Sequence, residues 1–214
     1  MLGKKEFSMI TKLALSLGIF GILSFFFLDQ KIAQYTLQLG VRTTLALRMF
    51  TFLFSPAFHI LGSTALALLA YFLALPQRLP LYTYALAQVV AGTTVQVAKN
   101  LIGRARPLIA GLDPYLVMPI SFAPQYHSFP SGHACVCATI GALFRFFFPK
   151  YKVPILLTAV MLPLIRVVQM KHFMSDVCLG LCVGFLITQS TISLFSQFME
   201  KKRPELVQKG ILAP

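Results

Sequence analysis

Residues Met174–Phe198 read MSDVCLGLCVGFLITQSTISLFSQF, and Asp176 is the only charged residue among them. A helix needs about 20 predominantly apolar residues to cross the hydrocarbon core of a bilayer. This run therefore predicts a membrane-spanning helix that carries one carboxylate close to its beginning. A charged group is costly near a bilayer unless it faces a polar cavity and acts with other groups, so Asp176 indicates a site at that end of the helix.

Five more apolar runs suit spanning helices: Thr11–Leu28, Phe50–Leu75, Leu81–Ala98, His133–Phe148 and Val153–Val168. The last two are slightly short. Of the 214 residues, 57% are hydrophobic and 12% are charged, whereas about a quarter of the residues in a soluble domain are charged. We therefore expect an all-α protein. It would be a polytopic membrane helix bundle with about six transmembrane helices, in a single domain over residues 1–214.

The distribution of lysine and arginine indicates which way the bundle faces. An even number of spans puts both termini on one side, and basic residues gather on the cytoplasmic side. We expect both termini to be cytoplasmic, because the inner segments then hold more basic residues once the clusters described below are left out. The first run is expected to stay attached, since no small-x-small cleavage pattern follows Phe25-Phe26-Phe27. The net charge of +13 suits anionic lipid headgroups, and we expect no nucleic-acid binding.

Three clusters of ionisable residues lie at the ends of apolar runs, and on this topology all three face outward. They are Lys99-x6-Arg106-Pro107, Pro130-Ser131-Gly132-His133 and Arg166-x5-His172-x3-Asp176. The cations Lys99, Arg106 and Arg166 have few outward carboxylates to pair with, so an anion is the missing partner. Arginine forks and a lysine point charge suit a tetrahedral oxyanion such as phosphate.

The second cluster opens a span, and a helix start binds anions because its first N–H groups are free. Ser131 is a candidate N-cap, and Gly132 allows close approach of the backbone. The N–H groups and the Ser131 hydroxyl would hold phosphate oxygens, and His133 would give a proton to a leaving oxygen. A capping turn with an interfacial histidine is the alternative.

In the third cluster, His172 and Asp176 are four residues apart, so they share one face of a helix. The carboxylate can hold one ring nitrogen of the imidazole, which frees the other nitrogen to attack. A metal-binding pair is the competing function, but three nearby cations would repel a divalent ion, and we expect no metal. A helix-start pair without chemistry is the remaining alternative.

In order and internal spacing, the three clusters resemble the three-part signature of the type 2 phosphatidic acid phosphatase superfamily, and the resemblance covers Lys99–Asp176. It implies a metal-independent phosphatase without a cofactor. It further implies that His172 forms a phosphohistidine, that Asp176 orients it, and that His133 protonates the leaving group and then activates water. The phosphate would be held by Lys99, Arg106, Ser131, Gly132 and Arg166. One position departs from the signature, because Ile165 stands where the family usually has serine.

On these grounds the sequence predicts an integral membrane lipid phosphatase that hydrolyses a terminal phosphate monoester or pyrophosphate. Its partners would be a lipid phosphate substrate and membrane lipids. Candidate substrates are lipid A, phosphatidylglycerophosphate, phosphatidate and undecaprenyl pyrophosphate, and the stretch Arg166–Asp176 is similar to bacterial lipid A phosphatases. With no Asn-x-Ser/Thr sequon, we expect a bacterial inner membrane and a site that faces the periplasm. A lipid phosphotransferase of the same superfamily and an anion or lipid-phosphate transporter are the alternatives.

Residues outside the three clusters have plainer expected roles. Arg104 would snorkel to the headgroups, and His59 would be a packed, hydrogen-bonded histidine. His127 would either touch substrate or be an ordinary loop residue. The cysteines are expected to pack helices closely, with a metal pair or a bridge as the alternative; they are Cys135, Cys137, Cys178 and Cys182.

Two long segments connect the predicted spans. Asp29–Gly40 has apolar residues at helical spacing, which predicts either a helix in the outer interface or the frayed end of the preceding span. Five prolines divide Lys99–Pro130, so a long helix cannot run through it. A structured functional loop is expected there.

Overall fold

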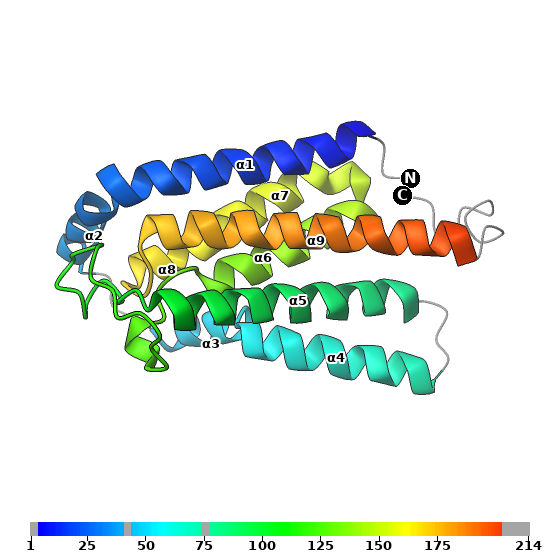
Figure 1. Ribbon diagram of the computed structural model, residues 1–214, viewed down its shortest axis with the longest axis horizontal. Coiled ribbons are helices and arrows are strands. Elements are labelled where there is room, and N and C mark those ends of the chain that lie inside the picture. The colour runs from blue at the N-terminus through cyan, green and yellow to red at the C-terminus, as the bar shows by residue number, and fades with distance from the viewer. Residues whose placement is uncertain (1–3, 41–43, 74–77, 203–214) are drawn as a thin grey trace.

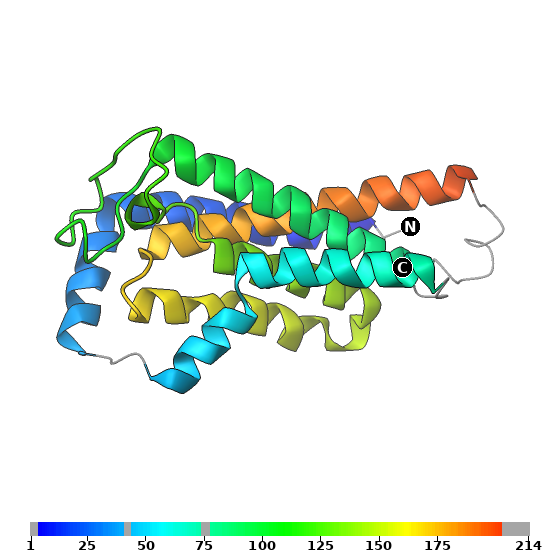
Figure 2. The same cartoon turned by 90° about the horizontal axis from the view of Figure 1, so that it is seen from below.

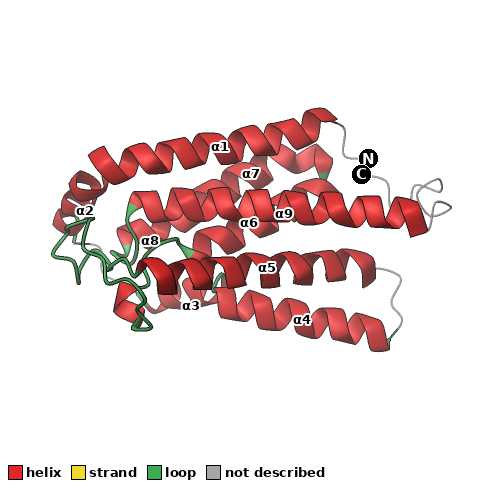
Figure 3. Ribbon diagram, in the orientation of Figure 1, coloured by secondary structure: helices red, strands yellow, loops and turns green. Residues whose placement is uncertain are grey.

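The computed structural model describes residues 4–40, 44–73 and 78–202. The long elements of this part are all helices (Figure 3): α1 (Lys4–Phe27), α2 (Asp29–Gln38), α3 (Leu45–Leu53), α4 (Pro56–Phe72), α5 (Arg78–Ile102), α6 (Gly132–Phe147), α7 (Lys152–Met161), α8 (Ile165–Val168) and α9 (Met174–Lys202). Short 3-10 helices lie between them: η1 (Pro124–Tyr126), η2 (Pro149–Tyr151) and η3 (Leu162–Leu164). The described residues form no β-strand, and the all-α fold class is confirmed.

The long helices lie side by side along one axis, with α9 in the interior of the bundle (Figure 1 and Figure 2). Helix α9 packs against α1, α5 and α6, while α7 packs on α6 and α4 packs on α5. The connection between α5 and α6, together with α2 and α8, gathers at one end of the bundle (Figure 1). Helix α1 begins and helix α9 ends at the opposite end.

Within the described ranges, three helical segments are long and apolar enough to cross a membrane: Met9–Phe27, Pro149–Val168 and Met174–Phe198. The bent pair Leu47–Leu53 and Pro56–Phe72 gives a fourth if its 45° bend is counted within one span. Each of the six apolar runs is mostly helical over its described residues, but the run Phe50–Leu75 is interrupted between Leu53 and Pro56. Helix α5 carries many polar residues and α6 has only 16 residues, so neither counts as a span by this measure. Six spans and cytoplasmic termini therefore stay a prediction.

Two glycines in α9 let this helix pack closely on α6. A Cβ atom at Gly180 would lie 2.4 Å from the backbone oxygen of Ser131, and one at Gly184 would lie 2.5 Å from that of Cys135. Small residues at a helix contact allow this close approach of the two backbones. The first turns of the two helices consequently meet, and the Ser131 N–H donates to the backbone oxygen of Asp176 at 2.9 Å.

The connection between α5 and α6 is a structured loop, as its prolines predict. The loop folds back on the end of α5, where the Met118 N–H donates to the Gly103 oxygen at 2.7 Å and the Ser121 N–H donates to the Asn100 oxygen at 3.0 Å. Gly103 has a φ of +60°, a conformation that costs glycine little. The short helix η1 is the only helix between residues 103 and 131.

Helix α2 is a separate helix and not the frayed end of α1. A turn at Leu28 separates the two, and α2 turns away from the axis of α1 (Figure 2). Its buried residues are Asp29, Ala33 and Thr36, whereas Tyr35 is exposed. The side of α2 that faces the protein therefore begins with a carboxylate, and its placement in a membrane interface stays a prediction.

Candidate active site

The three clusters of the sequence meet at the end of the bundle where α6 and α9 begin (Figure 1). Lys99 comes from the last turns of α5, Arg106 from the loop that follows, and Arg166 from α8. His172 lies in the short link between α8 and α9, and Asp176 lies in the first turn of α9. The charges of Lys99 and Arg166 both act on the His172 ring, so the first and third clusters share one site.

A backbone carbonyl holds the imidazole of His172 in one orientation. Nδ1 of His172 lies 2.7 Å from the oxygen of Ser128, and because a carbonyl can only accept, Nδ1 donates and Nε2 keeps its lone pair. Burial is the main cause that lowers the pKa of His172 below its usual 6.5. The ring is therefore neutral at neutral pH, which is the state of histidine that can act as a nucleophile.

The Asp176 carboxylate lies beside this ring and is bound by other donors. Its Oδ2 accepts from the Ser128 hydroxyl at 2.5 Å and from the Phe173 N–H at 2.8 Å, and its Oδ1 accepts from Arg104 at 2.5 Å. Oδ2 lies 3.6 Å from Nδ1 of His172. The shorter contact to His172 thus comes from the Ser128 carbonyl, whereas the sequence predicted that the carboxylate would hold the ring. Asp176 brings a negative charge next to the His172 ring.

Each of the three predicted cations uses some of its N–H donors in hydrogen bonds to the protein. Lys99 and Arg106 each donate to a backbone oxygen of the loop between α5 and α6, at 2.7 Å and 3.1 Å. Arg166 donates through one Nη1 to the Gln169 side chain at 2.6 Å. Its Nε is buried and has no hydrogen-bond partner among the described residues. Because a guanidinium carries five N–H donors, the two arginines keep donors for an anion.

Ser131 caps α6, as the sequence predicts, since its hydroxyl accepts the Ala134 N–H at 3.4 Å. Ser131 and Gly132 are both buried. The N–H groups of Gly132 and His133 belong to the first turn, which has no intrahelical partners for its N–H groups. Free N–H groups at a helix start favour a negatively charged ligand.

Helix α3 tethers His133, although none of the three clusters includes this helix. Nε2 of His133 lies 2.9 Å from the backbone oxygen of Thr51, so Nε2 donates and Nδ1 is the nitrogen at which a proton can be exchanged. His133 lines a small cavity together with Arg166 and Ile165. The isoleucine that departs from the family signature therefore borders the same cavity as the candidate acid.

Comparison with known sequences identifies the family of this chain. The sequence profile of the PAP2 superfamily matches residues 78–200, which is more than half of the chain and includes all three clusters. The chain belongs to the PAP2 superfamily. A lipid A 1-phosphatase from Rhizobium johnstonii is 33% identical over 110 residues, which is 51% of this chain and 45% of that protein. A lipid A 1-phosphatase from Rhizobium etli is 35% identical over 97 residues, 45% of this chain and 42% of that protein. The chain thus spans less than half the length of these relatives, and no solved structure matches it.

Arg104 lies inside the PAP2 match, but its surroundings differ from the prediction. Only 2% of the residue is exposed, and its two Nη atoms pair with Asp29, at 2.8 Å, and with Asp176. Its guanidinium also lies 4.9 Å and 4.3 Å from the ring centres of Phe25 and Phe173. The prediction that Arg104 snorkels to headgroups is wrong, because carboxylates and aromatic faces replace water around its charge.

Sequence reasoning missed Ser128, Asp29 and Arg104 as residues that contact His172 or Asp176, directly or through one another. Ser128 holds His172 through its backbone oxygen, which any residue type provides, so no signal for it exists in the sequence. Asp29 and Arg104 are 75 positions apart, and no rule of local spacing joins them. A signal for Asp29 existed nonetheless, because a carboxylate at the end of an apolar run is what singled out Asp176.

The remaining residues take the plainer roles. His59 hydrogen-bonds the Tyr84 hydroxyl at 2.6 Å, which confirms a packed histidine. The His127 ring donates to the Ser121 oxygen at 3.0 Å, as an ordinary loop residue does. All four cysteines are free, and three of them are buried, so they pack between helices and form no bridge.

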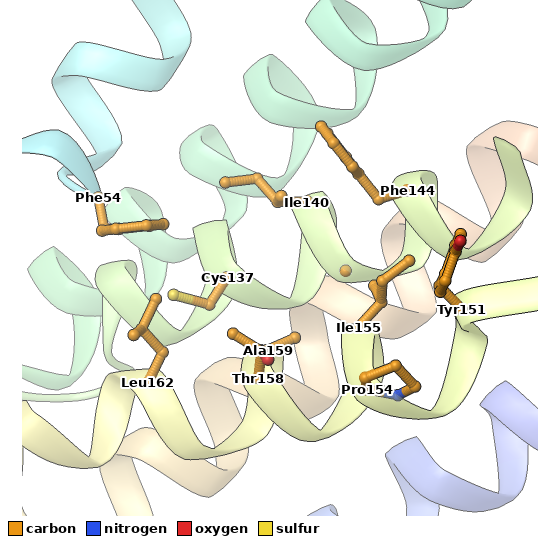
Figure 4. A pocket seen from close by; sticks show the side chains of 11 residues that line it. Phe54, Cys137, Ile140, Phe144, Tyr151, Pro154, Ile155, Thr158, Ala159 and Leu162 are labelled. Atoms are coloured by element: carbon orange, nitrogen blue, oxygen red, sulfur yellow. The ribbon is translucent and has the colours of Figure 1, made fainter. Parts of the chain in front are cut away.

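An apolar groove of about 390 Å³ runs between α6 and α7, beside the candidate site (Figure 4). The part of the groove that is farther from the site includes Phe144, Tyr151 and Ile155. Its inner lining residues are shared with the small cavity that His133 and Arg166 border; they are Phe54, Cys137 and Leu162. The groove therefore adjoins the site from the apolar side of the bundle.

Proposed function

We propose that the chain is an integral membrane lipid phosphatase that acts through a phosphohistidine at His172 and requires no metal. The observation that carries this proposal is the 2.7 Å hydrogen bond from Nδ1 of His172 to the Ser128 carbonyl. This bond leaves the Nε2 lone pair free at the end of the bundle where the cations gather. The PAP2 match supports phosphate chemistry, and the lipid A 1-phosphatase relatives support a lipid substrate.

In the proposed first step, the Nε2 lone pair of His172 attacks the phosphorus atom. A P–N bond forms, the bond from phosphorus to the lipid oxygen breaks, and its electron pair stays on that oxygen. Doubly protonated His133 gives its Nδ1 proton to the leaving oxygen while its Nε2–H stays on the Thr51 carbonyl. Proton donation of this kind stabilises the leaving group in the transition state.

In the proposed second step, water attacks the phosphorus atom of the intermediate and His133 takes a proton from that water at Nδ1. The P–N bond breaks, its electron pair returns to Nε2 of His172, and inorganic phosphate leaves. Nδ1 of His172 keeps its proton throughout, so the phosphorylated ring carries a positive charge. The Asp176 carboxylate, 3.6 Å from Nδ1, would stabilise this charge without taking the proton.

The phosphate group would be held by positive charge and by backbone N–H groups. The proposed binding residues are Lys99, Arg106, Ser131, Gly132 and Arg166. Such preorganised donors stabilise charge on the transferring phosphoryl group. The described residues bring together no three His, Cys, Asp or Glu side chains that could hold a metal ion.

We propose lipid A as the first substrate to test, because both relatives described above are lipid A 1-phosphatases. Phosphatidylglycerophosphate, phosphatidate and undecaprenyl pyrophosphate present the same phosphate on a lipid. The groove between α6 and α7 would take part of an acyl or prenyl chain while the phosphate enters the cationic end of the bundle. A bacterial inner membrane, with the site towards the periplasm and both termini in the cytoplasm, completes the proposal.

The test is release of phosphate from these lipids by protein purified in detergent, with a metal chelator present. We expect activity from the wild type and none from His172→Ala, while His59→Gln, a histidine change away from the site, stays active. Acid-labile, alkali-stable phosphoprotein should form in the wild type and not in His172→Ala. Equal release by wild type and His172→Ala would refute the nucleophile, and chelator-sensitive activity restored by a divalent cation would refute the metal-free mechanism. Release that needs an acceptor lipid would indicate a phosphotransferase.

A further inference from the structure

Asp29 is a fully buried carboxylate at the corner between α1 and α2, outside the region that matches the PAP2 superfamily. Four hydrogen bonds reach it. The hydroxyl of Ser24 donates to Oδ1 at 2.9 Å, and Arg104 donates to Oδ2 at 2.8 Å. The backbone N–H and the hydroxyl of Ser175 donate to Oδ1 and Oδ2, at 2.9 Å and 2.5 Å. The corner between α1 and α2 is thus bonded directly to the first turn of α9.

The guanidinium of Arg104 bridges two carboxylates. Nη2 binds Asp29 and Nη1 binds Asp176, and the three side chains are at most 2% exposed. The group therefore combines two negative charges with one positive charge, and next to the neutral ring of His172 its net charge is −1. Buried charge that is left over in this way is costly unless something positive pairs with it. The charges of Lys99 and Arg106 also act on Asp176, and that of Arg166 acts on the ring, but these are the cations proposed to bind the phosphate.

We propose that Asp29 is a positioning residue for phosphoryl transfer to His172. Asp29 compensates the positive charge of Arg104, so the negative charge of Asp176 remains available to the His172 ring. That negative charge is compensated when the ring becomes positive in the phosphohistidine. By bonding the N–H and hydroxyl of Ser175, Asp29 also fixes the turn from which Asp176 projects. This inference rests on the proposed function, because it assigns Asp29 a part in that same reaction.

The alternative is that Asp29 only stabilises the fold by compensating the buried Arg104. Both roles predict that losing Asp29 is harmful, so stability alone does not separate them. The two roles differ in whether the net charge beside the His172 ring matters for the reaction. If Asp29 is removed, Arg104 and Asp176 form a pair of net charge zero, and the ring of His172 loses its counter-charge. If Arg104 is removed as well, Asp176 keeps its full charge and the surplus of −1 returns.

The experiment compares Asp29→Asn, Arg104→Gln and the double variant, each purified in detergent and assayed with a lipid phosphate that the wild type hydrolyses. For Asp29→Asn we expect kcat to fall about tenfold, as for a change of one pKa unit in the interaction with the ring. KM should change little. The acid limb of kcat/KM should move to lower pH, because the loss of a nearby negative charge makes His172 harder to protonate. Asp113→Asn, which alters an exposed carboxylate in the loop, is the matched control and should leave kcat and the pH profile unchanged.

The double variant gives the decisive result. We expect Asp29→Asn/Arg104→Gln to have a higher kcat than Asp29→Asn alone and a pH profile closer to that of the wild type. A purely structural role also predicts that losing both partners of the buried pair is less harmful than losing Asp29 alone, but it predicts that the acid limb of the folded fraction moves in none of the variants, so the pH profile decides between the two roles. If Asp29→Asn does not fold, Arg104→Gln carries the comparison: it leaves two negative charges near the ring, so the proposal predicts that the acid limb moves to higher pH, whereas a purely structural role predicts no shift.

The outcomes separate this inference from the proposed function. If His172→Ala is inactive while Asp29→Asn keeps the wild-type kcat and pH profile, the inference is overturned and the proposed function stands. If His172→Ala is as active as the wild type, the phosphohistidine mechanism falls and this inference falls with it. A lowered kcat with a shifted acid limb, partly reversed in the double variant, supports both.

Discussion

Replacing Arg104 by leucine separates the two accounts of this residue, buried counter-ion and snorkelling side chain. The change keeps much of the side-chain volume and removes the charge. It leaves Asp29 and Asp176, both almost inaccessible to solvent, without the cation that lies between them. Removing one partner of a buried ion pair costs about 3–5 kcal/mol, so we expect Arg104→Leu to lower the free energy of unfolding by about 4 kcal/mol.

This loss translates into a thermal shift that is easy to measure. For a chain of about 150–250 residues, 1 kcal/mol corresponds to about 2–4 °C in Tm, so Arg104→Leu should melt roughly 8–16 °C below the wild type. Far-UV circular dichroism in detergent is the suitable assay, because the chain is helical and contains no tryptophan. Loss of two aromatic contacts with the guanidinium acts in the same direction.

The control for this prediction is Arg48→Leu. Arg48 is exposed on α3, and a surface substitution of this kind stays within about 0.5 kcal/mol. If Arg104→Leu also melts within about 2 °C of the wild type, the charge of Arg104 does not balance the two carboxylates.

Two further predictions concern the reaction. Because burial lowers the pKa of His172 from 6.5, the acid limb of kcat/KM that reports protonation of this ring should lie below pH 6.5, since the protonated ring has no lone pair; an acid limb at or above pH 6.5 would contradict this. Thr158→Trp, in the groove between α6 and α7, should raise KM for a long-chain lipid phosphate about tenfold, the cost of failing to bury about two methylenes, and leave KM for a short-chain phosphate unchanged. Ser190→Trp, in an apolar groove between α5 and α9, is its control, and equal effects of the two tryptophans would mean that the groove beside the site does not bind the chain.

Much of the architecture could be predicted from the sequence because it depends on local composition. Apolar runs of the length of a spanning helix became helices, the prolines of the loop after α5 excluded a long helix there, and Ser131 caps α6. These features follow from propensity and from residues a few positions apart. The count of spans was harder to predict. Helix α5 mixes polar with apolar residues and α6 is short, so length and hydropathy alone do not identify them as spans.

The site could be predicted only where its residues come in clusters. His172 and Asp176 share a helical spacing, which indicated that they act together but not how. The bond that fixes the ring comes from the Ser128 carbonyl, and a backbone oxygen has no signature in the sequence. Arg104 was misread for a related reason: its partner Asp29 is 75 positions away, and only the packing of α1 and α5 on α9 brings the two together.

A single carboxylate was expected to orient the His172 ring. In the structure, two different groups lie beside the ring, where one can orient it and the other can balance its charge. The Ser128 carbonyl can only accept, so it fixes the proton on Nδ1 whatever the charge of its neighbours. The Asp176 carboxylate, at 3.6 Å from the same nitrogen, is then free to act through its charge alone. An acceptor that holds the tautomer must stay in contact with the ring, whereas a counter-charge can act from a distance and can be adjusted by its own partners. On the proposed mechanism, this division is what would allow Asp29, which lies outside the PAP2 match, to influence His172 through Arg104.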